Sequence, residues 1–451
     1  MRQKGRKKHL VVGLGASGRA VCELLLSQGA RVCATDLRAM SEFNGALDSI
    51  EKAGAVLRLG GHSLEDFLGA ETIIVSPGIA LDIAPLAEAR SQGIEIAGEL
   101  EWASRQVSLP TVAVTGTNGK TTTTALIGEI VKQAGRRPFV GGNIGTPLSR
   151  WILSKEPADI LVLELSSFQL DTASTFRPDV GVLLNITEDH LDRYQSFEAY
   201  ADSKLSIFRR QNSADFALIN GDDPVCRRRA GEIPGRRLSF AGSCGSAHAS
   251  ICGGAVRLSV PGKDTVEISL EKTRLQGAHN RENIMAACLA ALCLDIGAAA
   301  MQAGVDAFPG FSHRVEWVRN WKGIDFYDDS KATNVGAVVK ALEGFERPVL
   351  LLLGGRDKLG AYEPLLAPLA ARGKGVFAFG EAGPKIYELL RGKVPAGLYP
   401  DLAAAFCQAL RSAAPGDVVL LSPACASFDQ YPSYARRGDH FKELIAGLND
   451  F

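Results

Sequence analysis

Short apolar runs alternate with helical patterns along most of the chain, and this alternation constrains the fold more than any other feature of the sequence. Each run is short enough for a buried strand, and several are followed by apolar residues at helical spacing. Strands that alternate with helices form βαβ units and parallel sheets. The sequence therefore predicts an α/β fold, with strands at 9–14, 31–35, 72–75, 111–114, 160–163, 180–184, 348–353 and 417–421.

The chain is too long for one ordinary core. Its 451 residues suggest about three domains, at roughly 150 residues each. One series of strands and helices opens near the start, a second near residue 106 and a third near residue 309, while residues 216–275 change to short alternating segments divided by glycines. We therefore expect domains at 1–105, 106–309 and 310–451, with a small antiparallel insert in the second.

Composition narrows the class of protein. Lysine plus arginine equals aspartate plus glutamate, at 50 each, which disfavours nucleic acid as a main partner. The most apolar run, around 350–353, is far shorter than the ~20 residues of a membrane span. The basic residues before position 9 resemble the start of a signal peptide, but Gly13 and Gly15 interrupt the apolar stretch behind them. Nine cysteines without a C-x-x-C pair favour reduced thiols, so we expect a cytoplasmic protein. With nucleic acid and a membrane disfavoured, we expect small molecules as its partners.

A glycine loop, Gly13-Leu14-Gly15-Ala16-Ser17-Gly18, follows the first predicted strand and precedes a predicted helix, and Asp36 ends the next strand. In this arrangement backbone N–H groups favour a pyrophosphate and the acid can bond a ribose hydroxyl. A UDP-sugar shares its diphosphate and ribose with half of NAD. The loop alone therefore fits an NAD(P)-dependent oxidoreductase and a nucleotide-sugar site equally, and a simple packing turn is the third interpretation.

A second glycine loop, residues 116–122 (GTNGKTT), lies between the strand at 111–114 and a helix. Glycines let consecutive N–H groups turn onto phosphate oxygens, Lys120 can reach the terminal phosphates, and Thr121 can offer a hydroxyl to Mg²⁺. Val114 stands where the standard motif has its first glycine. The loop predicts a nucleoside triphosphate site with Mg²⁺, and the alternative is a glycine-rich turn with a solvated lysine.

Four segments together resemble motifs of the Mur ligases and their folate-glutamylating relatives: residues 116–122, 164–170 (ELSSFQL), 185–194 (NITEDHLDRY) and 422–430 (SPACASFDQ). The resemblance runs from the first glycine loop to about Tyr434. It implies a Rossmann-like domain for a UDP-sugar, a central P-loop ATPase domain and a Rossmann-like domain for an amino acid.

The resemblance also implies an activity. We expect a monomeric, ATP-dependent ligase of peptidoglycan synthesis that adds D-glutamate to UDP-N-acetylmuramoyl-L-alanine through an acyl phosphate. A sister ligase that uses another amino acid is the nearest alternative. An NAD(P)-dependent oxidoreductase, from the first glycine loop alone, is the alternative from a different class.

The expected reaction needs cations more than acids and bases. Phosphoryl transfer depends on positioning and on neutralising charge across the phosphates, which suits Lys120 and Mg²⁺. Glu164 ends its predicted strand, where open α/β sheets bind ligands, so we expect it to bind Mg²⁺ rather than cap a helix. The resemblance makes His190 a ligand of a second metal ion and a contact of D-glutamate, whereas the residue alone fits an ordinary loop histidine.

The remaining nucleotide contacts follow from the resemblance. Those expected at ATP are Gly116, Thr117, Asn118, Gly119, Lys120, Thr121, Thr122, Asn280, Asn283, Arg314 and Asp329. Those expected at the UDP-sugar are Gly15, Ser17, Asp36, Ser76, Gly78 and Asn143. From the residues alone, Asn143 also fits a turn-capping residue, and Asn280 with Asn283 also fits helix capping.

D-glutamate carries two carboxylates, and lysines with hydroxyl donors complement them through charge-assisted bonds. The resemblance assigns this role to His190, Lys331, Thr333, Lys358, Ser427 and Tyr434. Two departures concern this pocket. Tyr434 stands where the family more often has phenylalanine, and Leu359 separates Lys358 from Gly360.

Lys204 lies in an apolar stripe, with Phe197, Ala201 and Phe208 at helical spacing in a predicted helix at 197–211. A lysine that packs its stem and keeps its ammonium in water explains this position from residue type alone. Burial would instead lower the lysine pKa, and a neutral amine can add CO₂ to form a carbamate. Residues 200–204 resemble the family segment that carries such a carbamate, so we expect carbamylated Lys204 to bind metal together with Thr121, Glu164 and His190.

Overall fold

The computed structural model describes residues 8–189, 193–242, 245, 247–275, 277–357 and 361–449. The chain divides into two compact units. The first unit consists of Met1–Glu271 with Glu282–Ala307, and the second of Lys272–Arg281 with Phe308–Phe451.

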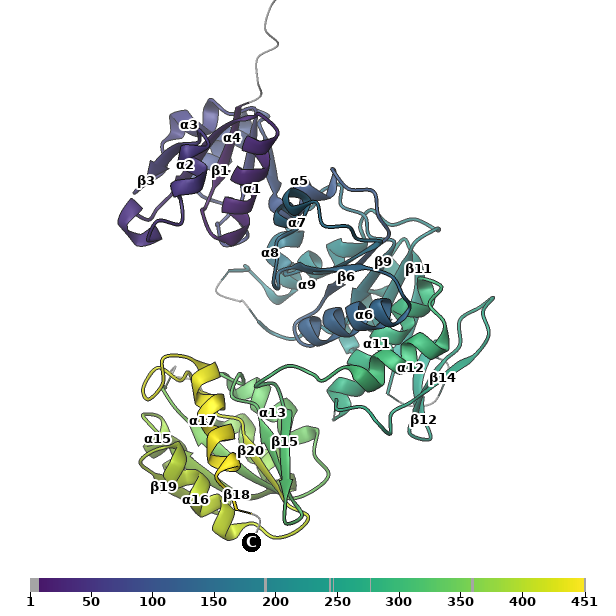
Figure 1. The fold of residues 1–451 in the computed structure, drawn as a ribbon, viewed down its shortest axis with the longest axis vertical. Helices are drawn as coiled ribbons and strands as arrows, with labels where there is room; N and C mark the ends of the chain where they lie inside the picture. The colour runs from purple at the N-terminus through teal and green to yellow at the C-terminus, as the bar shows by residue number, and fades with distance from the viewer. Residues whose placement is uncertain are drawn as a thin grey trace, which may run out of the picture. The chain divides into compact units, whose positions relative to one another are not determined.

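The first unit opens with a five-stranded parallel sheet in the order β3-β2-β1-β4-β5. Helices lie on its two faces (Figure 1). On the central strand β1, Val11 packs into one buried cluster while Leu10 and Val12 pack into the other, as strand alternation requires. The strands are β1 (Lys8–Val12), β2 (Arg31–Asp36), β3 (Val56–Leu59), β4 (Thr72–Val75) and β5 (Glu95–Gly98). The helices are α1 (Ala16–Ser27), η1 (Met40–Phe43), α2 (Asp48–Lys52), α3 (Leu64–Leu68) and α4 (Ala84–Ser91).

The rest of the first unit is built on a nine-stranded sheet in the order β14-β13-β12-β11-β10-β9-β6-β8-β7. Its strands are β6 (Thr111–Thr115), β7 (Pro138–Gly142), β8 (Ile160–Glu164), β9 (Val180–Leu183), β10 (Phe216–Asn220), β11 (Arg236–Ala241), β12 (Ala249–Cys252), β13 (Ala255–Leu258) and β14 (Val266–Ser269). Its helices are α5 (Glu99–Ser104), α6 (Lys120–Gln133), α7 (Leu148–Ser154), α8 (Ser167–Leu170), α9 (Phe197–Leu205), η2 (Ser206–Phe208), α10 (Pro224–Arg229), η3 (Ala230–Glu232) and α12 (Ala298–Ala307). Helix α11 (Ala278–Cys293) begins in the second unit and continues in the first.

The antiparallel part is smaller than the sequence predicted. Strands β10 and β11 pair in parallel with their neighbours and extend the main sheet, and the antiparallel pairs are β12 with β13 and β13 with β14. The prediction that the antiparallel insert begins at Phe216 was therefore wrong. The crossover between β10 and β11 is the six-residue helix α10, which is too short to show an apolar period in the sequence.

Two buried glutamates fix α5, the helix that directly follows β5, to the rest of the nine-stranded part. The carboxylate of Glu99 accepts a bond from the N–H of Ser149, at 2.7 Å, and burial raises the pKa of Glu99. The carboxylate of Glu101 accepts bonds from the N–H groups of Thr175 and Phe176, at 3.0 and 3.1 Å. Because buried carboxylates need such partners, the helix is fixed on both sides.

The second unit contains a six-stranded sheet in the order β15-β16-β20-β17-β18-β19, parallel except for the pair β15 and β16. The strands are β15 (Glu316–Trp321), β16 (Ile324–Asp328), β17 (Val349–Gly354), β18 (Gly373–Phe379), β19 (Ala396–Tyr399) and β20 (Val418–Leu421). The helices are α13 (Val335–Glu343), η4 (Glu363–Leu365), α14 (Leu366–Arg372), α15 (Gly383–Leu390), α16 (Leu402–Ser412) and α17 (Tyr434–Ala446). Buried clusters lie on both faces of the sheet, so this unit has a core of its own.

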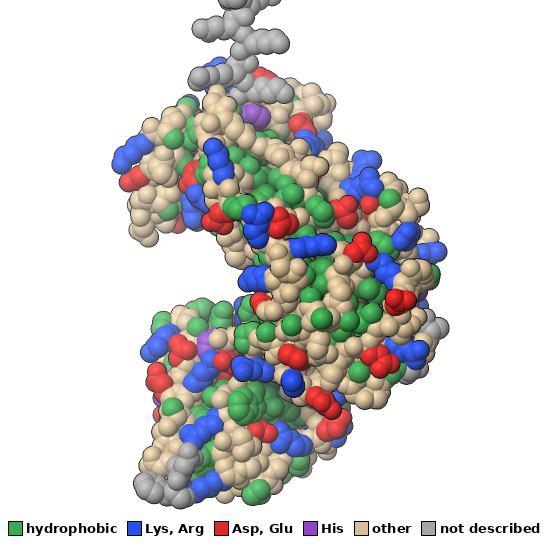
Figure 2. All heavy atoms as spheres, turned by 45° about the vertical axis from the view of Figure 1, so that its right-hand side comes forward, with side chains coloured by type: hydrophobic (Ala, Val, Ile, Leu, Met, Phe, Trp, Pro, Cys, Tyr) green, Lys and Arg blue, Asp and Glu red, His purple; other side chains and the backbone are tan. Residues whose placement is uncertain are grey.

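Three general expectations can be compared with the structure. Among the described residues, none of the helices has the length and apolar character needed to span a bilayer. On the face drawn in Figure 2, basic and acidic side chains are interspersed, in keeping with their equal numbers. Cys252 is disulfide-bonded, which contradicts the expectation that all the thiols are reduced, because cysteine spacing alone does not reveal which pairs meet in the fold.

Candidate functional site

The second glycine loop connects β6 to α6, at the carboxyl ends of the parallel strands. Gly116 and Gly119 have φ angles of 152° and 85°, which favour glycine. A Cβ on Gly119 would lie 2.3 Å from Oδ1 of Asn283, so the loop passes close to helix α11. The N–H groups of the first turn of α6 have no partners inside the helix. This combination is the geometry of a phosphate site.

Two lysines meet at the backbone of this loop. Nζ of Lys120 donates to the carbonyls of Gly116 and Thr117, at 2.8 and 2.9 Å, and Nζ of Lys204 donates to the same Gly116 carbonyl at 2.9 Å. Lys204 is 2% exposed and its ammonium lies 4.6 Å from the centre of the Tyr200 ring. The interpretation that Lys204 packs its stem and keeps its ammonium in water is therefore wrong, because the whole side chain is buried.

Burial lowers the pKa of Lys204 to about 7, and the positive charge of Lys120 acts in the same direction. A lysine of this kind is neutral in a large fraction of molecules near neutral pH. It is therefore chemically able to react with CO₂.

Glu164 ends β8 with a carboxylate that is only partly satisfied. Its Oε1 accepts a bond from Nδ2 of Asn143 at 2.7 Å. Its Oε2 is buried and has no hydrogen-bond partner among the described residues. Because an orphaned buried carboxylate oxygen is costly, this atom fits a cation ligand. Asn143, expected at the UDP-sugar, directly orients this carboxylate and so has a use that the sequence did not suggest.

The first glycine loop is fixed by the two polar residues predicted beside it. Oδ2 of Asp36 accepts from the N–H of Leu14 at 2.7 Å, and the hydroxyl of Ser76 donates to the carbonyl of Gly13 at 2.6 Å. Hydrogen bonds from Arg38 and Leu14 hold the pKa of Asp36 at about 2, against the opposing effect of burial. A Cβ added to Gly15 or to Gly78 would meet nothing within 4 Å, so there is room for a ligand. Ser17 lies at the start of α1 in the same loop.

In the second unit, Asp329 follows β16 and is bonded within the protein. Its oxygens accept from the N–H of Val315 at 3.1 Å and from the hydroxyl of Ser422 at 2.7 Å, and burial raises its pKa to about 7. Both carboxylate oxygens therefore have partners in this structure. Arg314, half-buried, lies on the same segment as Val315.

Four residues expected at D-glutamate also belong to the second unit. The ammonium of Lys331 lies 5.2 Å from the centre of the Tyr434 ring, so these two side chains face each other. Thr333 follows Lys331 closely, and its N–H donates to the Lys331 carbonyl at 2.8 Å. Ser427 is buried in the loop after β20. Lys331 itself is exposed, as a ligand-binding cation must be.

Arg437 organises these loops, a role that was not predicted from the sequence. It is fully buried in α17 and donates to the carbonyls of Ser330 and Cys425, at 2.9 and 3.0 Å. Its Nη1 also reaches the carbonyl of Ala426 at 3.2 Å. Arg437 precedes Phe441 and Ile445 at helical spacing. A charge inside an apolar stripe was the same signal that singled out Lys204.

His190 and Lys358, together with Leu359, lie outside the described residues. Asn280 and Asn283 are both buried in α11, and Oδ1 of Asn283 accepts from the hydroxyl of Thr123 at 3.2 Å. Asn283 therefore lies at the phosphate loop, while Asn280 counts with the second unit.

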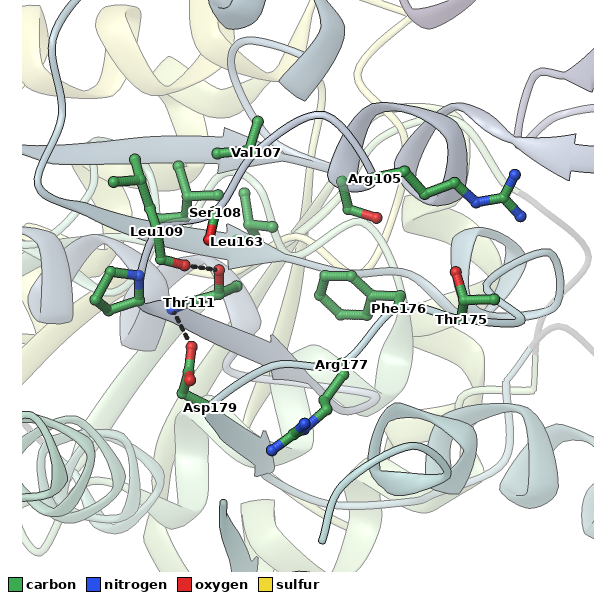
Figure 3. A pocket seen from close by; sticks show the side chains of 13 residues that line it. Arg105, Val107, Ser108, Leu109, Thr111, Leu163, Thr175, Phe176, Arg177 and Asp179 are labelled. Carbon is green, nitrogen blue, oxygen red and sulfur yellow. Dashed lines mark hydrogen bonds between the residues drawn. The ribbon is translucent and has the colours of Figure 1, made fainter. Parts of the chain in front are cut away.

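A cavity of about 520 Å³ lies beside the amino-terminal ends of β6 and β9 (Figure 3). Thr111, Phe176 and Asp179 are among its walls, and Asp179 accepts from the N–H of Thr111 at 2.8 Å. Arg177, also at its edge, is paired with Asp215 at 2.7 Å. Open α/β sheets bind substrates at the opposite, carboxyl end of their strands. This cavity is therefore separate from the phosphate loop.

Family comparisons agree with these features over most of the chain. A MurD-like N-terminal domain of Mur ligases matches residues 7–98, the Mur ligase middle domain matches 114–291, and the glutamate ligase domain of Mur ligases matches 313–425. The chain belongs to the Mur ligase family.

Curated relatives are more specific. The UDP-N-acetylmuramoylalanine–D-glutamate ligase of Desulfosudis oleivorans is 46% identical over 445 residues, which cover 98% of this chain and 97% of that protein. The ligase of the same name from Geotalea uraniireducens is 42% identical, with 98% of each chain covered.

Solved structures share the fold. A pseudomurein peptide ligase type C from Methanothermus fervidus has a TM-score of 0.59 at 19% identity, and the alignment covers 98% of this chain and 100% of that chain. UDP-N-acetylmuramate-alanine ligase from Thermotoga maritima has a TM-score of 0.57 at 18% identity, and the alignment covers 98% of this chain and 99% of that chain. The three-part α/β architecture expected from the sequence is therefore confirmed.

Proposed function

We propose that this chain is an ATP-dependent ligase that joins D-glutamate to UDP-N-acetylmuramoyl-L-alanine in peptidoglycan synthesis. The observation that carries the proposal is the similarity to D-glutamate ligases along 98% of the chain, at 42 to 46% identity. We place the reaction in the cytoplasm, as the sequence predicts. We also propose a monomer, with domain boundaries near residues 106 and 309.

The chain's own groups can perform activation of a carboxylate. The N–H groups at the start of α6 bind the ATP phosphates, and Lys120 exchanges the carbonyls of Gly116 and Thr117 for phosphate oxygens. An oxygen of the substrate carboxylate bonds to the γ-phosphorus as the bond from that phosphorus to the β-phosphate oxygen breaks, so ADP leaves and an acyl phosphate forms. The amine of D-glutamate then attacks that carbonyl, the C–N bond forms and phosphate leaves.

Mg²⁺ fits the residues beside the loop. When bound, it supplies positive charge that offsets the phosphates. Oε2 of Glu164 is the natural ligand, because it is buried and unpartnered among the described residues, and Thr121 offers its hydroxyl. We propose that Lys204 becomes a carbamate and His190 completes this group of ligands. The support for the carbamate is the burial and lowered pKa of Lys204.

The remaining predicted residues take the substrates. Gly15, Ser17 and Gly78 border the space proposed for the UDP-sugar, while Asp36 and Ser76 hold the glycine loop in shape. We propose that D-glutamate binds in the second unit through Lys331, Thr333, Lys358, Ser427 and Tyr434. Arg314 and Asp329 are proposed at the ATP ribose, with Asn280 near the nucleotide.

The test is release of phosphate from ATP with defined substrates. The full chain is incubated with Mg-ATP, UDP-N-acetylmuramoyl-L-alanine and one amino acid from a panel of D-glutamate, L-glutamate, L-alanine and meso-diaminopimelate. We expect release only with D-glutamate. Release with a different amino acid alone would identify a sister ligase, and no release together with NADH oxidation would overturn the ligase.

A further inference from the structure

The phosphate loop lacks the first glycine of the standard motif, and a neighbouring segment restricts its shape instead. Val114 is a buried residue of β6, so the loop begins later than in the standard motif. A loop with two glycines samples many conformations unless other bonds restrict it. Those bonds come from residues 184–187, which follow β9.

Asn185 contributes three of these bonds. Its backbone carbonyl accepts from the N–H of Thr117 at 3.0 Å. Its side-chain Oδ1 accepts from the N–H of Asn118 at 2.8 Å, while its Nδ2 donates to the carbonyl of Asn118 at 3.1 Å. One amide side chain therefore binds both backbone groups of a single loop residue. Thr187 adds a bond from its N–H to the Thr117 hydroxyl, at 3.0 Å.

These bonds also decide which N–H groups can reach a ligand. The N–H groups of Thr117 and Asn118 point to Asn185, so they are not directed at phosphate. The N–H groups of the first turn of α6 remain for that purpose, because the helix gives them no partner. The direction in which the loop enters α6 thus depends on the Asn185 amide.

We propose that Asn185 is a positioning residue that holds the loop in its phosphate-binding shape. The inference rests on the proposed function, since it takes ATP as the ligand of the loop. Asn185 is half-buried and Asn118 is exposed, so water can replace the lost bonds in a variant. A change at Asn185 should therefore affect nucleotide binding much more than folding.

The test compares two asparagines at the ends of adjacent strands. Asn185→Leu keeps the branched shape of the side chain and removes both side-chain bonds. Asn220→Leu is the matched control, because Asn220 ends β10 and bonds to Glu282 and Asp222 instead of the loop. Calorimetry of the full chain measures the Kd of Mg-ATP, and thermal melting without nucleotide measures stability.

For Asn185→Leu we expect about a tenfold higher Kd of Mg-ATP, since two ordinary hydrogen bonds correspond to roughly that factor. The melting temperature should stay near that of the wild type, and the KM for ATP should rise while the KM for D-glutamate stays unchanged. Asn220→Leu should melt earlier and bind Mg-ATP normally.

Unchanged Mg-ATP binding in Asn185→Leu would overturn the proposal, and so would equal weakening in both variants. The binding measurement needs no UDP-sugar or amino acid. A wild type that binds Mg-ATP but releases no phosphate would therefore refute the ligase function and leave the result for Asn185 valid.

Discussion

Replacing Lys204 with methionine should stabilise the unmodified protein and abolish its activity. The pKa of Lys204 is lowered to about 7 by burial, followed by the charge of Lys120, whereas a free lysine titrates near 10.4. Between these two pH values the unfolded chain binds more protons than the native one, so the stability of the wild type rises with pH across that window. At pH 7 the difference between the native and unfolded pKa values of Lys204 lowers the free energy of unfolding by roughly 4 kcal/mol.

The net effect of the substitution is smaller, because methionine also gives up two favourable contacts. These are the bond to the Gly116 carbonyl and the contact with the Tyr200 ring, worth roughly 1 kcal/mol each. We therefore expect Lys204→Met to be about 2 kcal/mol more stable at pH 7, or several degrees in melting temperature. The advantage should shrink as the pH rises toward 10.4, because only above that pH is the wild-type lysine mostly neutral in the unfolded state as well as the native state.

The assay is thermal melting from pH 7 to pH 10 in buffer free of CO₂ and Mg²⁺, so that the lysine is unmodified. Lys132→Met is the control, because that side chain is 62% exposed and should change the melting temperature little. In parallel, labelled CO₂ should give a carbamate carbon signal in the wild type only. A less stable Lys204→Met at pH 7, or an effect independent of pH, would refute the reasoning, and full activity in Lys204→Arg would refute the carbamate.

Four further outcomes are expected. Gly15→Val should raise the KM for the UDP-sugar without lowering the melting temperature, because its Cβ enters open space. Gly18→Val, in contrast, should have a lower melting temperature, because a Cβ there would lie 1.9 Å from the Gly13 carbonyl oxygen. Lys120→Ala should lower kcat by roughly 10²-fold or more in steady-state phosphate release. Glu164→Gln should weaken Mg²⁺ binding, so a metal titration of turnover should need a higher Mg²⁺ concentration to reach half of the maximal rate. An unchanged half-maximal concentration would contradict the role of Glu164 as a ligand. Ser427→Ala should raise the KM for D-glutamate at least fivefold while that for the UDP-sugar stays constant, and equal losses for both substrates would favour a structural role.

The regular elements followed from short-range patterns. The strand at 72–75 was predicted at its observed limits, and the phosphate loop was found because glycines and a lysine at fixed spacing have one common use. The start of the antiparallel insert was wrong, because the pairing of β10 depends on which strand lies beside it and not on its own residues.

Side-chain roles were predicted less completely, for a related reason. Asp36 and Asp329 were predicted only as nucleotide contacts, and the sequence did not reveal that their oxygens also accept bonds from backbone and hydroxyl groups brought close by the fold. The amide of Asn143 turns to Glu164 across adjacent strands, and no spacing in the chain encodes that distance. Arg437 carried the same pattern as Lys204 and could have been found by it.

The buried carboxylates of α5 affect how this protein can be recombined with its relatives. A crossover placed at residue 106 would bring Glu101 of one parent against residues 174–176 of another, and a mismatch there would bury a charge without its donors. Exchanges that keep α5 together with that loop and with the start of α7 preserve both sets of bonds. Libraries of chimeric ligases should therefore be richer in active members when these segments come from a single parent than when the first ~105 residues are exchanged as a block.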